Sequence, residues 1–187
     1  YVADTGNHLI RLISSNGGAS GTTSTLAGTS SGYVNGASNI SAFSMPTGVA
    51  VSSSGSVFVA DTNNCAIRKI TSGLVSTFAG AGPNSAGTGP VSCGSSDGVG
   101  TDARFNLPTG IAIDSSNNLY VADTANNKIR RITPAGVVTT IAGSGATGWA
   151  DGQGDVATFD APTGIAADSS GNIYVVDLGS SKIRKIR

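Results

Sequence analysis

The stretch Tyr120-Val-Ala-Asp-Thr124 decides the fold, because close copies of it recur three more times along the 187-residue chain. The other copies begin at Tyr1, Phe58 and Tyr174, so the successive separations are 57, 62 and 54 residues. Repeats of this length are typical of arrays of small structural units, in which each unit buries its apolar face against its neighbours. The sequence therefore predicts a repeat architecture.

Each copy lies within a longer pattern whose internal spacing does not change. An arginine follows the aspartate of each copy by seven residues, and a Pro-Thr-Gly motif begins fifteen residues before the last three aspartates. The aspartates are Asp4, Asp61, Asp123 and Asp177, the arginines are Arg11, Arg68, Arg130 and Arg184, and the prolines are Pro46, Pro108 and Pro162. Since this spacing is constant while the period varies, the variation in length must lie in one loop of each unit.

One unit has the pattern of four short strands. The apolar runs 110–114, 119–123, 128–133 and 137–142 are separated by the polar turns Ser-Ser-Asn-Asn, Thr-Ala-Asn-Asn and Pro-Ala-Gly. Strands of this length joined by tight polar turns are typical of an antiparallel meander. Apolar and polar residues alternate poorly within the runs, which indicates a sheet covered on both faces, as in a propeller of stacked blades.

The four motifs of the unit resemble a known repeat family. In order they are Pro-x-Gly-Ile-Ala-x-Asp, Tyr-Val-Ala-Asp-Thr-x-Asn, Ile-Arg-Lys-Ile and Thr-Ile-Ala-Gly, and together they resemble the NHL repeat over nearly the whole chain. The resemblance implies blades of four antiparallel strands, usually six in a closed ring. It implies no single activity, because a fold does not determine a function.

We therefore expect an all-β protein: a β-propeller segment of four-stranded antiparallel blades, about 3.5 blades with 14 strands, over residues 1–187. The expected units are a partial blade at 1–28, blades at 46–80 and 108–143, a partial blade at 162–187, and Gly-rich loops at 29–45, 81–107 and 144–161. The first unit begins at its second strand and the last stops at its third. Because terminal repeats normally need caps, we expect a larger ring or assembly, completed by further copies or by the rest of the same chain.

The long loops share a signature of their own. An Asn-Gly or Asp-Gly pair, beginning at Asn35, Asp97 or Asp151, precedes a phenylalanine by eight residues. The phenylalanines are Phe43, Phe105 and Phe159. A large apolar side chain is needed where a long loop returns to the core, so we predict that each phenylalanine plugs the space between neighbouring blades.

The composition argues against catalysis in this segment. The acidic residues are all aspartates, and His8 is the only histidine. Lactonase-like propellers hold a central metal with carboxylates and amides in which glutamate is prominent, and the peptide-amidating lyase uses zinc with several histidines. We therefore predict no catalytic residue, no metal and no cofactor. We interpret the repeated aspartates Asp4, Asp61, Asp123 and Asp177 as structural residues that accept hydrogen bonds from turn amides, with Asn64 and Asn127 completing two of the turns.

Calcium and RNA are alternative ligands. The segments Asp97–Asp102 and Asp151–Asp155 carry oxygen ligands on Gly-rich loops, as calcium sites do, although Asn35–Asn39 has no acid and Asx-turns explain these residues without an ion. Eleven Lys and Arg residues balance eleven Asp, and the basic residues cluster in the third strand of each unit. We interpret them as a solvated rim and expect no nucleic acid partner. No run of 18 apolar residues exists, so we expect no membrane insertion.

Cysteine usage and a sequon bear on the cellular compartment. Cys65 and Cys93 fall in segments expected on the same face of one unit, where a disulfide would pin the longest loop; two unpaired thiols are the alternative. Asn39-Ile-Ser41 is an N-glycosylation sequon in the first long loop. Together these features favour an extracellular or secreted protein.

Two aromatic residues lie at equivalent places in the long loops. Tyr33 and Trp149 each precede the Asn-Gly or Asp-Gly pair by two residues, where an aromatic side chain is either a binding anchor or a packing contact with the next blade. The preferred function is a non-catalytic extracellular scaffold or assembly module that associates head to tail through open blade edges. The alternatives are a protein- or glycan-binding propeller with its ligand on the long-loop face and, more remotely, an enzyme whose site lies in blades absent from this chain.

Overall fold

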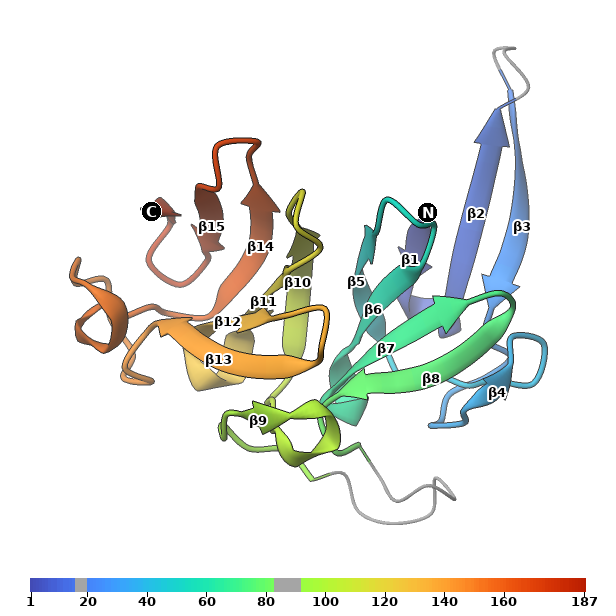
Figure 1. The fold of residues 1–187 in the computed structure, drawn as a ribbon, viewed down its shortest axis with the longest axis horizontal. Helices are drawn as coiled ribbons and strands as arrows, with labels where there is room; N and C mark the ends of the chain where they lie inside the picture. Colours follow the sequence, from blue (N-terminus) through green and yellow to red (C-terminus); the bar gives the residue numbers. More distant parts are fainter. Residues whose placement is uncertain (16–19, 83–91) are drawn as a thin grey trace.

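Four antiparallel sheets follow one another along the chain and lie side by side as the blades of a β-propeller (Figure 1). The computed structural model describes residues 1–15, 20–82 and 92–187. Each sheet is a meander, because its main strands pair in the order in which they occur in the sequence. The helical segments in this part of the chain are single 3-10 turns, and none is long and apolar enough to cross a membrane.

The strand bounds follow the repeat. Blade 1 contains β1 (Val2–Asp4), β2 (Leu9–Ser15) and β3 (Gly21–Ala27). Blade 2 contains β5 (Pro46–Val51), β6 (Val57–Asp61), β7 (Ala66–Thr71) and β8 (Leu74–Ala79). Blade 3 contains β10 (Pro108–Ile113), β11 (Leu119–Asp123), β12 (Lys128–Ile132) and β13 (Val137–Ala142). Blade 4 contains β14 (Pro162–Ala167), β15 (Ile173–Asp177) and β16 (Lys182–Ile186).

Two short strands add to the fourteen that the sequence predicts. β4 (Gly36–Ala37) pairs with β8, and β9 (Gly98–Val99) pairs with β13. Each belongs to a long loop that folds back along the outer edge of its blade. Two residues are too few to show a periodic pattern, so these strands are not visible in the sequence.

Apolar side chains of neighbouring blades meet around the phenylalanines of the long loops. Phe43 lies in one cluster with Ile10 of blade 1 and Val59 of blade 2. Phe105 occupies the same place between blades 2 and 3, and Phe159 between blades 3 and 4. All three rings are almost completely buried, so they fill the space between consecutive blades.

The Pro-Thr-Gly motif lies where neighbouring blades contact each other. Thr62 Oγ1 donates a hydrogen bond to the carbonyl oxygen of Pro108 at 2.8 Å, and the equivalent bond repeats between blades 3 and 4. A Cβ atom at Gly110 would lie 2.0 Å from the carbonyl oxygen of Thr163 in the next blade. Only glycine therefore allows the two backbones to approach this closely.

Candidate functional site

The arginine of the third strand is buried in the three blades that are preceded by a long loop. The side chains of Arg68 and Arg130 are fully buried, and that of Arg184 is 9% exposed. The interpretation of these arginines as part of a solvated rim is therefore wrong. The sequence did carry a signal for their pairing, because an aspartate precedes the arginine by seven residues in every unit.

In blade 2, Arg68 ties the long loop to the sheet. Its Nη1 forms an ion pair with Asp61 Oδ2 at 2.7 Å and donates a hydrogen bond to the Ala42 carbonyl oxygen at 3.2 Å. Its Nη2 donates to the Val34 carbonyl oxygen at 3.0 Å and to Asn35 Oδ1 at 2.7 Å. One guanidinium thus binds both the second strand and two separate parts of the loop, as its fixed fork of donors allows.

The aspartate of the network holds the loop at the point where it returns to the blade. Asp61 Oδ1 accepts a hydrogen bond from the Ser44 amide at 2.7 Å, and Asp61 Oδ2 accepts one from Asn64 Nδ2 at 2.8 Å. Asp61 therefore binds the returning loop and a side chain of its own turn instead of the turn amides. In blade 3 the residue equivalent to Asn64 is Asn126, and Asn127 instead adopts the left-handed conformation that ends the turn.

Blade 3 repeats the network with an acidic residue in the loop. Arg130 Nη1 pairs with Asp123 Oδ2, and Arg130 Nη2 pairs with Asp97 Oδ1, both at 2.7 Å. Asp97 also accepts hydrogen bonds from the amide and the hydroxyl of Thr140 on β13, at 3.1 and 3.0 Å. A single loop carboxylate therefore binds both the third and the fourth strand of the blade.

Burial and hydrogen bonding move the pKa values of these aspartates in opposite directions. Burial raises the pKa of Asp61 and of Asp123, although hydrogen bonds and the paired arginines counteract the shift. Burial acts in the same direction on Asp97, but hydrogen bonds from Thr140 and Arg130 outweigh it and lower the pKa of that carboxyl. The carboxylates are engaged with the protein itself, so the arrangement stabilises the fold rather than offering a free acid or base.

Blade 1 lacks most of this network. Asn7 donates a hydrogen bond to Asp4 Oδ1 at 2.9 Å, as in the interior blades. Arg11, however, donates from Nη1 to Thr25 Oγ1 at 3.2 Å and forms no ion pair with Asp4 within the described residues.

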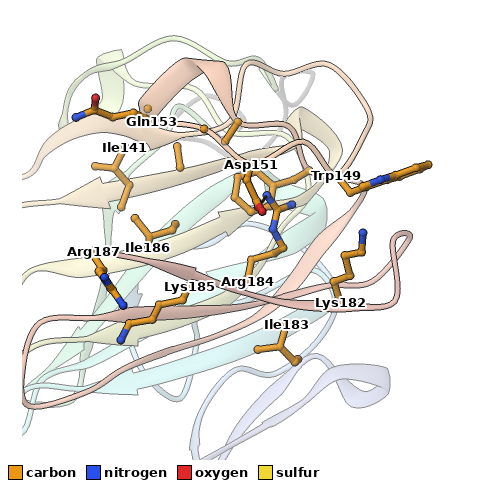
Figure 2. A pocket seen from close by; sticks show the side chains of 15 residues that line it. Ile141, Trp149, Asp151, Gln153, Lys182, Ile183, Arg184, Lys185, Ile186 and Arg187 are labelled. Atoms are coloured by element: carbon orange, nitrogen blue, oxygen red, sulfur yellow. Dashed lines mark hydrogen bonds and ion pairs between the residues drawn. The ribbon is translucent and has the colours of Figure 1, made fainter.

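Blade 4 keeps the network but borders an open groove of about 1000 Å³ (Figure 2). The groove lies between β16, the end of β13 and the loop 149–159. Arg184 pairs with Asp177 at 3.2 Å and with Asp151, on the groove wall, at 2.5 Å. Ile141 and Ile186 give the groove apolar surface beside this charged pair.

The two loop aromatics have different environments. Tyr33 is 5% exposed, and its ring lies 4.3 Å from the guanidinium carbon of Arg68, so it is a packing residue. Trp149 is 62% exposed at the rim of the groove, with the Lys182 ammonium 5.2 Å from its ring. Only Trp149 remains available as a binding anchor.

The remaining predicted residues also have defined positions. Cys65 and Cys93 form the predicted disulfide. Asn39 is exposed in a turn that follows β4, so its side chain is accessible, and its glycosylation stays a prediction. The loop aspartates considered for calcium, Asp97 and Asp151, instead bind arginines. Within residues 1–15, 20–82 and 92–187, no three His, Cys, Asp or Glu side chains lie close enough together to hold a metal ion.

The NHL repeat family model matches this chain at three places: residues 43–70, 105–132 and 159–186. Each match begins at a phenylalanine between two blades and ends in the third strand of the blade that follows it. The matched segments therefore contain both the aspartate and the arginine of each buried network.

Relatives and solved structures agree with this match. NHL repeat-containing protein 2 of Bos taurus is 32% identical over 151 residues, which cover 76% of this chain and 20% of that protein. Protein SUPPRESSOR OF QUENCHING 1, chloroplastic, of Arabidopsis thaliana is 34% identical over 94 residues, covering 50% of this chain and 9% of that protein. An auxiliary nutrient binding protein from Bacteroides thetaiotaomicron has a TM-score of 0.68 at 22% identity, covering 97% of this chain and 43% of that one, which shows a shared fold alone. The chain spans a fifth or less of the length of NHL repeat-containing protein 2 and of SUPPRESSOR OF QUENCHING 1.

Proposed function

Because this chain belongs to the NHL-repeat β-propeller family, we propose that it is a non-catalytic protein-binding scaffold whose copies associate end to end. The proposal includes an extracellular or secreted setting, which the Cys65–Cys93 disulfide favours because disulfides persist in oxidising compartments. The partner is a further blade that packs on the outward face of blade 1 or blade 4, supplied by a second copy of this chain or by the rest of the same polypeptide.

The observation that carries the proposal is the exposed apolar face of blade 4. Ile183 is 69% exposed, whereas Ile67 and Ile129, at the same position of β7 and β12, are fully buried against the next blade. Val176 and Leu178 extend the exposed face. In the part of the chain that the structure describes, side chains of the kind that is buried between blades 2 and 3 are thus exposed on blade 4, which supports a contact with a further blade.

The other end of the chain presents the complementary kind of face. Ile13 is 52% exposed, whereas Ile70 and Ile132, at the same position of β7 and β12, are buried. Val2 is likewise exposed where Val59 is buried. Because these two kinds of face pack on each other between the interior blades, we expect blade 4 of one copy to pack on blade 1 of the next, a heterologous contact.

The polar residues support a non-catalytic role. Asp61 and Asp123 are buried and hydrogen-bonded within the protein, and Asp177 is bonded to Arg184, to Ser180 and to a loop amide. The single histidine, His8, accepts a hydrogen bond from the backbone amide of Met45 at 3.0 Å. General acid–base catalysis needs a titratable group free to reach a substrate.

Sedimentation velocity over a range of protein concentrations tests the proposal. We expect reversible association that Ile183→Glu abolishes, because the charge would be buried in the contact. Val156→Glu is the matched control, since Val156 is 66% exposed in a 3-10 turn (Gly154–Val156) of the long loop that precedes blade 4. A chain that stays monomeric at high concentration, or an Ile183→Glu variant that associates normally, would refute the end-to-end contact.

A mixing experiment tests the head-to-tail geometry. Ile13→Glu should also abolish association, because it damages the blade 1 face. When the Ile13→Glu and Ile183→Glu variants are mixed, one intact pair of faces remains, so we expect a dimer that grows no further. An isologous contact would instead let one of the two variants dimerise on its own, because the variant with the self-pairing face intact needs no mixing.

A second candidate function is ligand binding on the long-loop face, which the exposure of Trp149 favours. Screening the chain against a glycan array would reveal such a ligand. Loss of a detected signal in Trp149→Ala, with unchanged folding, would support this candidate.

A further inference from the structure

We propose that a small hollow between blades 2 and 3 binds the carboxylate of a small organic acid, with Lys69 as the counter-ion. The hollow has a volume of about 210 Å³, and all of its walls come from these two blades, between residues 52 and 134. Neither Ile13 nor Ile183 lines it, so the proposal does not rest on end-to-end association. The argument starts from a difference between blade 2 and the two blades that follow it.

Blades 3 and 4 hold a carboxylate of their own at the equivalent place. In blade 3, Asp114 begins the turn between β10 and β11 and accepts a hydrogen bond from the Tyr120 hydroxyl at 3.1 Å. In blade 4, Asp168 accepts the same bond from Tyr174 at 3.3 Å. The residue that pairs with the tyrosine across the second and third strands is basic in both blades: it is Arg131 in blade 3 and Lys185 in blade 4. In each of these blades, one tyrosine thus has an acidic residue and a basic residue as its neighbours.

Blade 2 keeps the basic residue but lacks both the acid and the phenol. Ser52 replaces the aspartate and Phe58 replaces the tyrosine, while Lys69 pairs with Phe58 across β6 and β7. Lys69 forms no ion pair in the part of the chain that the structure describes, and residues 16–19 and 83–91 contain no acidic residue. Lys69 also lines the hollow. An ammonium there attracts an anion, and the anionic group that blade 2 lacks relative to blades 3 and 4 is a carboxylate.

Hydroxyl and amide groups around Lys69 provide additional hydrogen-bond donors for a carboxylate. Ser52 and Ser54 line the hollow with hydroxyls whose oxygens lie 2.9 Å apart. Asn117, from the neighbouring turn of blade 3, also lines the hollow and has a side-chain amide. In blade 3 the Asp114 carboxylate accepts one bond from an amide side chain and one from a hydroxyl. The donors around the hollow are thus of the kinds that already bind a carboxylate in this protein.

Two phenylalanine rings give the hollow an apolar wall beside the charge. The Lys69 ammonium lies 5.7 Å from the centroid of the Phe58 ring and 6.0 Å from that of the Phe78 ring. Both rings line the hollow, so the carbon body of an acid bound at Lys69 has apolar surface to contact. The volume of the hollow is below the range of about 300–1,000 Å³ that is typical of pockets for drug-sized ligands, so the acid has to be small.

Benzoate is the probe for the whole 187-residue chain, because it joins a carboxylate to a small apolar ring. We expect saturable NMR chemical-shift changes at low ionic strength, concentrated in residues 52–56 and 114–118 and at Lys69. Benzamide has nearly the same shape without the charge, so it should bind at least about tenfold more weakly, because hydrogen bonds to a charged acceptor are lost. Shifts concentrated elsewhere, shifts that do not saturate, or equal binding of benzoate and benzamide would overturn the proposal.

Removing the counter-ion tests the role of Lys69. Lys69→Met should weaken benzoate binding about tenfold or more, because the charged donor is lost. Arg131→Met is the matched control, since Arg131 occupies the same position in blade 3 and does not line the hollow, and it should leave binding unchanged. Equal losses in the two variants would refute the site. Lys69→Met should also keep the end-to-end association of the parent chain, so failure of one proposal is distinguishable from failure of the other.

Ser52→Asp tests the comparison between the blades without removing the lysine. It supplies the carboxylate that blade 3 has in Asp114, so it should abolish benzoate binding in a folded chain. Ser53→Asp adds the same charge at an exposed position of the same turn that does not line the hollow. Benzoate binding should then change by about twofold or less, because water weakens the interaction between exposed charges. A folded Ser52→Asp variant that binds benzoate as the parent does would contradict the proposal.

Discussion

The interior blades and the terminal blades share one sequence pattern, but they differ in what surrounds the arginine of the third strand. In blades 2 and 3 the arginine is fully buried and bound by the second strand and the preceding loop. In blade 1, Arg11 has lost the ion pair, and in blade 4, Arg184 keeps its aspartates beside an open groove. The aspartate and the arginine lie on one hairpin, formed by the second and third strands. The difference between the blades shows that the remaining acceptors for the arginine come from segments far away in the chain.

The acceptors on the loop matter because the arginine carries a buried charge. Removing a guanidinium from water is costly unless its donors find acceptors, and Arg68 finds three of them on a loop that lies 26 to 34 residues before it. The Asp-Arg pair alone supplies only part of that compensation. Blades 2, 3 and 4 therefore depend on their loops for this compensation, whereas in blade 1 the side chain of Arg11 is partly exposed.

The largest expected difference between the two kinds of blade follows from removing the arginine. Arg130→Met leaves Asp123 buried without its counter-charge, so we expect the free energy of unfolding to fall by about 3–5 kcal/mol. Arg11→Met, in blade 1, should cost about 1 kcal/mol or less, because it removes one exposed hydrogen bond. Urea unfolding monitored by circular dichroism measures both. Equal losses would show that the buried network does not set interior blades apart.

The disulfide distinguishes the two interior blades from each other, because blade 3 has Asn127 where blade 2 has Cys65. The double variant Cys65→Ser/Cys93→Ser should lower the free energy of unfolding by about 2–4 kcal/mol, because the unfolded chain regains the freedom of a closed loop. Thermal unfolding with and without reductant provides the measurement. If reductant leaves the midpoint of the oxidised parent unchanged while thiol titration detects free cysteines, the bond does not stabilise blade 2.

Close approach of the blades gives a smaller difference. Gly110→Ala would place a Cβ against the Thr163 carbonyl oxygen of blade 4, and we expect a loss of about 1–3 kcal/mol from overpacking. Gly164→Ala, at the same position in blade 4, meets only the side chain of Val176, with 2.9 Å to Cγ2. It should cost clearly less in the same unfolding experiment. A larger loss of unfolding free energy for Gly164→Ala than for Gly110→Ala would mean that contact with the next blade is not the reason for a glycine at this position.

The smallest effect concerns acid sensitivity. Hydrogen bonds lower the pKa of Asp97 below its ordinary value of 3.8, so its ionised form stabilises the folded state above that pH. This contribution is lost as the pH falls through the lowered pKa. Asp97→Asn copies Asn35 of blade 2, so we expect a change of about 1 kcal/mol or less at pH 7 and a shallower loss of stability below about pH 4. An unchanged pH dependence in urea unfolding would contradict the role of Asp97.

The terminal groove and the exposed aromatic could be predicted only in part. The sequence places Tyr33 and Trp149 at equivalent loop positions, but Tyr33 is covered by Arg68 while Trp149 remains exposed beside the groove. Nothing in the local pattern separates them, because their exposure depends on which strands are present around each loop. The disulfide was predictable because strand direction in a meander decides which loops share a face.

By itself, the sequence determined the strand order, the blade pattern and the phenylalanine plugs. These features depend on local periodicity, turn residues and the size of one side chain, all of which can be read within a single repeat. Only the tertiary structure decided that Arg68 and Arg130 are buried and that Asp151 remains open. Burial of a charge depends on acceptors supplied by segments distant in sequence, and no single repeat contains them.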